Sequence, residues 1–479
     1  MEILSALEPG AVFHFFEQLC AIPHGSGNTK EISDWCVEFA RARGLEHYQD
    51  ALNNVIIIKE AAPDYEGAEP VILQGHLDMV CEKEPSCPKD MAREGLDLAV
   101  EGDYVLARGT TLGGDDGIAV AMALALLDSG EIPHPRLEVV LTVDEEVGML
   151  GAAVLETAPL KGRTLLNLDS EVEGVFTVSC AGGNRTKCVL PVRREAFAGA
   201  GLQVSVGGLA GGHSGTEIHR GRANANLLLG RCLGAIAART ELRLGWAEGG
   251  GKDNAIAAGS TAQIVAADPE AARAAVEALE ADLHREYRAA DPGLFLKLEP
   301  SDWAGEPMDG ESTRRAVCML TCLPNGVQAM SGDIPGLVQT SLNLGILNTE
   351  EGALTACFSV RSSLESQKEE LKGRLACLME QLGGYVEYSG DYPAWEYREE
   401  SPLRERMVQV FREQYGREPQ IEAIHAGLEC GLLASKLPGL DCVSIGPDLL
   451  EIHTPRERMS VSSVQRVWAF LLEVLRRSR

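Results

Sequence analysis

The segment Val71–Asp78 (VILQGHLD) joins an apolar run to two side chains that can bind metals or protons. Its first residues are typical of a buried strand. His76 and Asp78 follow at i, i+2 spacing, which places both on one side of an extended chain. In open α/β sheets the carboxyl ends of strands line the ligand crevice, so we expect both side chains to face it. By itself, the pattern also fits a structural hydrogen-bonded pair.

The sequence around this segment alternates apolar runs with helical patterns. Strand-like runs lie at 55–59 (VIIIK), 137–143 (LEVVLTV) and 164–168 (TLLNL), and helical patterns at 11–21, 28–43 and 118–127 (IAVAMALALL). The last of these is apolar nearly all round, which indicates a buried helix. Strands separated by helices predict an α/β fold whose sheet is covered by helices on both faces.

From about Gly182 the pattern changes, and two segments share a strand–helix–strand outline. They span residues 261–298 and 355–388, and after Trp395 the earlier α/β pattern returns. We therefore expect a first domain built from residues 1–182 and 395–479, with an α+β domain of two related β-α-β halves inserted at 183–394. Coincidence between two common motifs remains an alternative explanation of the outline that the two segments share.

Four further clusters of acids or histidine follow predicted strands or precede the buried helix. They are Gly113–Gly117 (GGDDG), Asp144–Gly148 (DEEVG), Asn167–Glu171 (NLDSE) and Glu451–Pro455 (EIHTP). Taken singly, the first fits a helix start and the second a solvated acidic loop. Three acids after a buried strand are nevertheless costly to crowd unless cations or protons compensate their charge.

Together the clusters predict a metal centre. The implied ligands are two imidazoles and three carboxylates, from His76, Asp115, Glu146, Asp169 and His453. Such a set suits two borderline cations such as Zn²⁺ that share Asp115. Mixed nitrogen and oxygen ligands disfavour Ca²⁺, and the lack of cysteine ligands disfavours a structural zinc site.

Composition excludes several other functions. Of the 479 residues, 43 are Lys or Arg and 71 are Asp or Glu, a net charge of −28 that disfavours nucleic acid or anionic membrane as a partner. No uninterrupted apolar run is long enough for a transmembrane helix, and the first ten residues do not resemble a signal peptide. The 13 cysteines include no C-x-x-C pair. A cytoplasmic protein is expected.

The ordered motifs resemble the dinuclear zinc peptidase family that contains carnosinases, peptidase T and acetylornithine deacetylase, and are most similar to its bacterial cytosolic dipeptidases. The resemblance rests on HLD at 76–78, TLGGD at 111–115, DEEVG at 144–148, NLD at 167–169, GGHSG at 211–215, KDNAI at 252–256, SVRSS at 359–363, HAGLECG at 425–431 and IHTP at 452–455. It implies a zinc exopeptidase-like catalytic domain, a mixed sheet sandwiched by helices, with the inserted segment as a lid.

The resemblance also implies roles for individual residues. His76 and Asp169 would hold one zinc, Glu146 and His453 the other, and Asp115 would bridge them, with Mn²⁺ or Co²⁺ as possible substitutes. Asp78 would support His76, Glu145 would be the general base, and the peptide bond after Asp115 would be cis. Asp116 departs from the family pattern, and its effect on the site is left open.

The resemblance implies four substrate-binding residues, which are His213, Asn254 and Arg361 in the inserted domain and Gly427 after it. His213 would stabilise the oxyanion and Arg361 would hold a free C-terminal carboxylate. The implied function is hydrolysis of Xaa-His and other dipeptides by a homodimer that pairs through the lid. A deacylase of N-acyl amino acids and a metal-binding relative without catalysis remain alternatives. The preferred side chains, the metal and the oligomeric state are left open.

Overall fold

The computed structural model describes residues 3–479, which form two compact units. Unit 1 contains residues 3–179, 397–423 and 428–479, and unit 2 contains 180–396 and 424–427. The short piece 424–427, which we expected in the first domain, belongs to unit 2 because the Ala181 amide donates to the carbonyls of Ile424 and Ala426 at 3.1 Å. This places His425 and Gly427 in the same unit as His213 and Arg361.

Unit 1 is built on a mixed eight-stranded sheet. Its order is β1 (Glu46–Gln49), β2 (Val55–Lys59), β6 (Leu137–Thr142), β3 (Val71–His76), β7 (Thr164–Asn167), β19 (Asp441–Ser444), β8 (Val175–Cys180) and β18 (Gln420–Ile424). The central strands β6, β3, β7 and β19 pair in parallel, whereas β1 with β2, β2 with β6, and β8 with β19 pair antiparallel. Parallel pairing brings the carboxyl ends of the central strands to one edge of the sheet.

Helices supply the rest of the unit 1 core. They are α1 (Gly10–Cys20), α2 (Lys30–Ala42), α3 (Gly114–Asp128), α4 (Leu150–Val154), α9 (Pro402–Tyr415), α10 (Glu429–Lys436) and α11 (Val461–Arg476), with a 3₁₀ turn at Pro63–Tyr65. Every residue of 118–127 in α3 is buried, as its all-round apolar sequence predicts. No helix within residues 3–479 is long and apolar enough to cross a bilayer.

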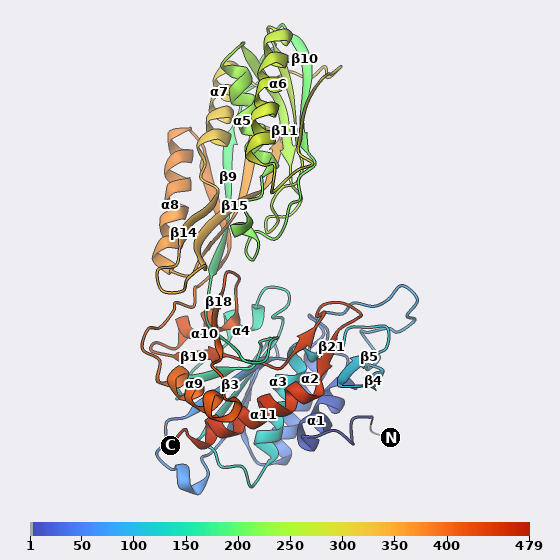
Figure 1. Cartoon of the computed structure of the whole chain (residues 1–479), viewed down its shortest axis with the longest axis vertical. Coiled ribbons are helices and arrows are strands. Elements are labelled where there is room, and N and C mark those ends of the chain that lie inside the picture. The colour runs from blue at the N-terminus through green and yellow to red at the C-terminus, as the bar shows by residue number, and fades with distance from the viewer. Residues whose placement is uncertain (1–2) are drawn as a thin grey trace. The chain divides into compact units, whose positions relative to one another are not determined.

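A small four-stranded sheet ties the C-terminal segment to residues 98–107. Its order is β20 (Leu449–Leu450), β21 (Arg458–Ser460), β5 (Tyr104–Ala107) and β4 (Leu98–Glu101). In Figure 1, β21 near the red end of the colour scale lies beside β5 near its blue end. The pairing of β20 with β21 fixes both ends of the loop that carries His453.

Unit 2 is a nine-stranded sheet with four long helices. Along the sheet run β13 (Phe295–Pro300), β10 (Ala200–Gly207), β12 (Ser260–Ala266), β11 (Leu242–Gly249), β15 (Val338–Glu350), β16 (Ala353–Ser362), β9 (Gly182–Pro191) and β17 (Tyr385–Tyr392), and β14 (Gly326–Met330) pairs with β15. The helices are α5 (Ala225–Ala237), α6 (Pro269–Glu286), α7 (Gly310–Cys322) and α8 (Glu365–Gln381), with a 3₁₀ turn at Ile218–Arg220.

Both strand–helix–strand segments expected from the sequence occur in unit 2. They are β12–α6–β13 and β16–α8–β17, and in each the two outer strands flank a third, β10 or β9, with antiparallel pairing. Asp268 caps α6, since its carboxylate accepts the amides of Glu270 and Ala271 at 3.0 Å. The apolar faces of the helices and the sheet form one continuous core.

Candidate active site

The carboxyl ends of three neighbouring strands in unit 1 bring the predicted ligands together. His76 ends β3, the acids Glu145 and Glu146 follow β6, and Asp169 follows β7. Asp115 joins them from the start of α3. Since these strands are parallel neighbours, residues far apart in the sequence meet at one edge of the sheet.

The five predicted ligands form two groups that share Asp115. In one group, His76 Nε2 lies 3.2 Å from Asp115 Oδ1 and 3.8 Å from Asp169 Oδ1. In the other, His453 Nε2 lies 3.1 Å from Asp115 Oδ2 and 2.9 Å from Glu146 Oε1. The two oxygens of Asp115 therefore face different histidines, as a carboxylate that bridges two cations would.

His76 is held by its own neighbours in the orientation that a ligand needs. Its Nδ1–H donates to the backbone carbonyl of Asp78 at 2.9 Å, which leaves the Nε2 lone pair directed at the carboxylates. The Asp78 carboxylate lies farther away, with Oδ1 at 3.5 Å from that nitrogen. It accepts the amides of Glu145 at 3.1 Å and Glu146 at 3.4 Å and the Ser26 hydroxyl at 2.8 Å. Asp78 thus fixes the acidic loop as well as the histidine.

Asp116 is buried, and its carboxylate lies beside the backbone of His76. Its Oδ2 accepts the His76 amide at 3.2 Å, and the Asp115–Asp116 peptide bond is cis. A Cβ at Gly75 would lie 2.5 Å from the same oxygen, so glycine is needed at this position. His76, Asp116 and Asp169 also bring ligand atoms within 4.8 Å of one another. Asp116 therefore anchors the end of β3, and burial raises the pKa of its carboxyl well above the ordinary value.

The acids of the site lie close together, and bound cations would compensate their negative charges. Burial, together with the charge of Asp116, raises the pKa of Asp169 well above its ordinary value. Burial and the charges of Glu146 and Asp115 outweigh His76 and raise the pKa of Glu145 to about 7. Hydrogen bonds to Asp115 and Glu146 raise the pKa of His453 to about 10. Clustered carboxylates with imidazole nitrogens therefore fit two borderline divalent cations.

A buried polar layer next to this centre was not predicted from the sequence. Glu429 Oε2 accepts hydrogen bonds from Gln74 Nε2 at 2.5 Å and Thr142 Oγ1 at 2.6 Å, and Asn167 Nδ2 donates to Gln74 Oε1 at 2.6 Å. Burial and the charge of Glu145 raise the pKa of Glu429 to about 8. Gln74 and Asn167 could have predicted this layer, because they are polar residues inside apolar strands and a buried polar side chain needs a hydrogen-bond partner.

In unit 2, His213 presents a free donor nitrogen. Its Nδ1 accepts the amides of Gly215 at 3.2 Å and Thr216 at 3.1 Å, which puts the ring proton on Nε2. Burial and the charge of Arg361 lower the pKa of His213, which favours this neutral form. The Asn254 carbonyl accepts the Ser214 amide at 2.9 Å, so the segment of Asn254 lies beside that of His213.

Arg361 on β16 donates from Nη1 to the Tyr392 hydroxyl at 3.0 Å. Burial, followed by the charges of Arg361 and His213, lowers the pKa of His425 to about 3, and His425 Nε2 pairs with Ser341 Oγ at 2.7 Å. Gly427 follows His425 by two residues. Neither His425 nor Tyr392 was predicted as a site residue, since each is recognised only through contacts between distant segments.

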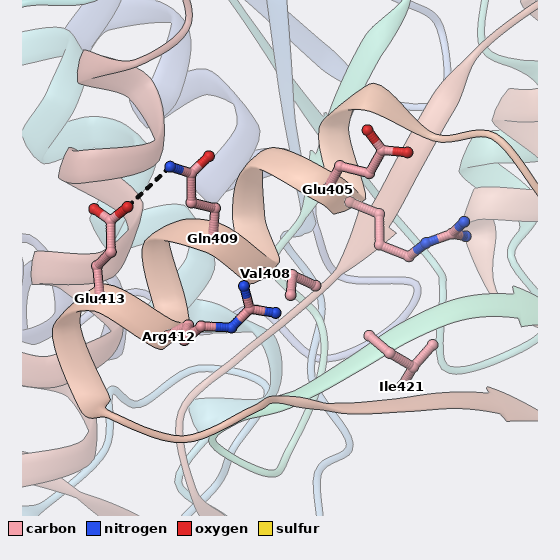
Figure 2. A pocket seen from close by; sticks show the side chains of 7 residues that line it. Glu405, Val408, Gln409, Arg412, Glu413 and Ile421 are labelled. Carbon is pink, nitrogen blue, oxygen red and sulfur yellow. Dashed lines mark hydrogen bonds between the residues drawn. The ribbon is translucent and has the colours of Figure 1, made fainter.

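Two cavities in unit 1 differ in what lines them. One of about 470 Å³ contains Glu146 in its wall beside the apolar side chains of Met79, Met91 and Val147. The other, of about 520 Å³, follows α9 and contains no predicted site residue; Figure 2 shows its largely charged lining, with Gln409 bonded to Glu413 at 2.9 Å. Only the first therefore bears on the candidate centre.

Comparisons with known proteins agree with the resemblance inferred from the motifs. The model of Peptidase family M20/M25/M40 matches residues 72–477. A cytosol non-specific dipeptidase of Escherichia coli (strain K12) is 36% identical over 481 residues, which covers 99% of each chain. The structure of an aminoacylhistidine dipeptidase from Vibrio alginolyticus is similar with a TM-score of 0.91 and 36% identity, over 99% of this chain and 97% of that one.

An aminopeptidase PepT from Bacillus cereus shares the fold, with a TM-score of 0.58 at 16% identity over 98% of this chain and 99% of that chain. The predicted α/β class with a mixed sheet covered by helices is thereby confirmed. The family inferred from the motifs is confirmed as well, since the matching model covers most of the chain. This chain belongs to peptidase family M20/M25/M40 and is a peptide-bond hydrolase.

Proposed function

We propose that this chain is a metal-dependent dipeptidase that hydrolyses Xaa-His and other dipeptides. The observation that carries the proposal is the carboxylate of Asp115, whose two oxygens face His76 and His453, while the carboxyl of Glu145 lies close to His76 and Glu146. The similarity to two proteins named as dipeptidases over nearly the whole chain supports the substrate class. The name of one of them also supports a cytoplasmic location.

The metal centre would hold two Zn²⁺ ions, with Mn²⁺ or Co²⁺ as substitutes. His76 and Asp169 would bind one ion, Glu146 and His453 the other, and Asp115 both. When bound, such a pair of cations supplies Lewis acidity that acidifies water and polarises the scissile carbonyl. The uncompensated acids described above support this assignment.

Glu145 would act as the general base and then as the general acid. Its carboxylate takes a proton from the attacking water and delivers it to the leaving amine, so two proton transfers use one side chain. A carboxylate within reach of both the water and the amine can carry the proton from one to the other. Asp78 would position Glu145 through the backbone amide that it accepts.

The residues of unit 2 would bind and orient the substrate. The Nε2–H of His213 would donate to the developing oxyanion, and Arg361 would hold the C-terminal carboxylate and so select short peptides. Asn254 and Gly427 would contact the peptide backbone. We further propose that the segment 183–394 is the lid of the catalytic domain and that two copies of the chain pair through it.

Substrate hydrolysis by the metal-free protein, repleted with Zn²⁺, Mn²⁺ or Co²⁺, tests the proposal. The panel sets Xaa-His and other dipeptides beside tripeptides and N-acetyl amino acids. It includes Met-Gly and Gly-Met, since the cavity beside Glu146 is lined by apolar side chains. We expect metal-dependent cleavage confined to dipeptides. Glu145→Ala should lower kcat by roughly 10²–10⁴-fold while two metal ions per chain remain bound.

Glu171→Gln is the matched control, because Glu171 is a nearby acid outside the ligand groups, and this variant should keep normal kcat. Cleavage of the N-acetyl compounds instead of dipeptides would identify a deacylase. Binding of metal without any hydrolysis would identify a metal-binding protein that lacks catalysis. Full activity of Glu145→Ala would refute the assignment of the base.

A further inference from the structure

Glu457 is a buried carboxylate whose two oxygens are occupied by backbone amides. Its Oε2 accepts N–H from Leu112 at 2.7 Å and Gly113 at 3.1 Å, and its Oε1 accepts N–H from Gly114 at 2.8 Å and Asp115 at 3.4 Å. Only 3% of the residue is exposed. Four consecutive amides that end at the bridging aspartate are thus held by one side chain.

The other end of Glu457 lies in the loop that presents His453, four residues earlier. Two non-glycine residues of this loop are left-handed, Glu451 at φ 54° and His453 at φ 59°. Such conformations are costly and persist where surrounding contacts hold them. Packing alone does not hold His453, since 44% of its side chain is exposed.

Hydrogen bonds hold the loop instead. Thr454 Oγ1 donates to the Glu451 carbonyl at 2.8 Å, and the Glu457 amide donates to the Thr454 carbonyl at 3.0 Å. Directly after Glu457, β21 pairs with β5. The loop is therefore fixed at both ends to the small sheet and, through the Glu457 carboxylate, to the turn that carries Asp115.

We infer that Glu457 is a positioning residue of the metal centre, which holds Asp115 and His453 in register with each other. This inference rests on the proposed function, since it concerns the cation that those two residues would share. His453 Nε2 and Asp115 Oδ2 lie 3.1 Å apart although 338 positions separate them in the sequence. Metal ligands must keep their separation within about 0.5 Å, which requires a rigid link between their segments.

Two features separate this role from others. Glu457 belongs to none of the metal-binding groups found among residues 3–479, and its oxygens already accept amides, so it is not a ligand itself. It also lies between two ligand segments, unlike Glu138, a buried carboxylate of unit 1 that likewise accepts backbone amides. Glu138 accepts the amides of Lys161 and Gly162 at the opposite end of β6 from Glu146.

Zinc affinity of the metal-free protein, measured by competition with a chromophoric chelator, tests the inference. Glu457→Gln keeps the shape of the side chain but replaces one acceptor oxygen by a donor, so we expect the affinity for one of the two ions to fall by about 10–100-fold. Glu457→Asp should show a smaller loss. The matched control Glu138→Gln should lower Tm and leave zinc affinity unchanged.

Steady-state rates separate positioning from simple destabilisation. At saturating zinc, Glu457→Gln should lower kcat with little change in KM, and circular dichroism should report a folded chain. In the wild-type protein, hydrogen exchange at the amides of 112–115 should be strongly protected. This last measurement needs no variant to fold, and rapid exchange there would overturn the inference.

The inference would also be overturned if folded Glu457→Gln bound zinc as tightly as the wild-type protein, or if Glu138→Gln lost as much zinc affinity as Glu457→Gln. A wild-type chain that binds two zinc ions without cleaving dipeptides would refute the proposed activity, while the affinity comparison would still decide the role of Glu457. A wild-type chain that binds no divalent cation would refute both.

Discussion

Asp115 is the residue on which the geometry of the candidate centre depends. Its two oxygens lie 3.2 Å from His76 Nε2 and 3.1 Å from His453 Nε2, and its amide contacts Glu457. Hydrogen bonds from His453 and His76 outweigh burial and lower the pKa of Asp115. It therefore stays ionised at neutral pH, in contrast to Asp169, whose pKa is raised. Asp115 is therefore an anion even in the metal-free chain, whereas Asp169 would ionise when cations bind beside it.

Arg361 offers a test at the scale of one side chain. Arg361→Ala should lower kcat/KM for dipeptides by about 10–100-fold through a higher KM, since a charged hydrogen bond contributes about 1.5–3 kcal/mol. C-terminally amidated dipeptides should lose less than about 3-fold, because they lack the carboxylate that the guanidinium would bind. Steady-state kinetics on paired substrates measures both.

Tyr392→Phe is the control for Arg361. It removes the hydroxyl that accepts the Nη1 bond but keeps the guanidinium, so its effect on dipeptides should be much smaller. Equal losses for free and amidated substrates in Arg361→Ala would contradict the carboxylate role.

At the scale of elements, β3, β6, β7 and α10 share a buried polar layer beside the centre, contributed by Gln74, Thr142, Asn167 and Glu429. Glu429 is fully buried, and its Oε1 makes no hydrogen bond within residues 3–479. Burial raises its pKa from 4.5 to about 8, so the folded chain holds its proton at neutral pH. These elements therefore pack around a carboxylic acid rather than a carboxylate.

This layer predicts how the stability of the metal-free protein depends on pH. A carboxyl whose pKa is higher in the folded chain than in the unfolded chain stabilises the folded state by holding its proton. This contribution is complete at pH values below the unfolded pKa and is lost as pH rises through the folded pKa. The contribution of Glu429 is therefore lost as pH rises from about 4.5 through about 8. Urea unfolding of chelator-treated protein at pH 6.5 and 8.5 measures it.

Glu429→Gln, a neutral side chain of the same shape, should flatten this dependence by up to about 1.4 kcal/mol per pH unit. The wild-type minus variant difference isolates Glu429 from the other groups that titrate in this range. An identical pH dependence in both proteins would show that Glu429 is ionised in the folded chain.

The elements also mark how far the sequence could predict the fold and the site. The strands that end at His76 and Asn167 and the buried helix 118–127 were recognisable because their apolar patterns are long and are followed by acids or glycine. Strands β20 and β21 have two and three residues, too few to show a period. Glu457 stands between two arginines and resembles a solvated charge, because its amide partners lie more than 340 positions away.

At the scale of the whole molecule, the net charge of −28 shapes how charged substrates approach. A negative field attracts cationic dipeptides and repels acidic ones, and salt screens it. We expect KM for a Lys-containing dipeptide to rise several-fold between about 10 and 300 mM ionic strength, where the Debye length falls from roughly 30 Å to below 10 Å. A neutral dipeptide of similar size should change little.

Initial rates at constant pH and saturating metal measure this effect. A glutamate-containing dipeptide provides the opposite control, since its KM should fall as salt increases. Parallel changes for all three substrates would show that salt acts on the protein itself and would contradict steering by the net charge.

The position of β19 in the large sheet has a consequence for how the protein is made. This strand, residues 441–444, lies between β7 and β8, although those two strands follow one another in the chain. During translation, the edges of β7 and β8 stay unpaired until more than 250 further residues have been made and β19 has left the ribosome. His453 emerges later still, so a nascent chain that stops before residue 441 has an incomplete sheet and lacks His453. Under the proposed function, a nascent chain would therefore lack a complete metal centre until β19 and His453 have been made.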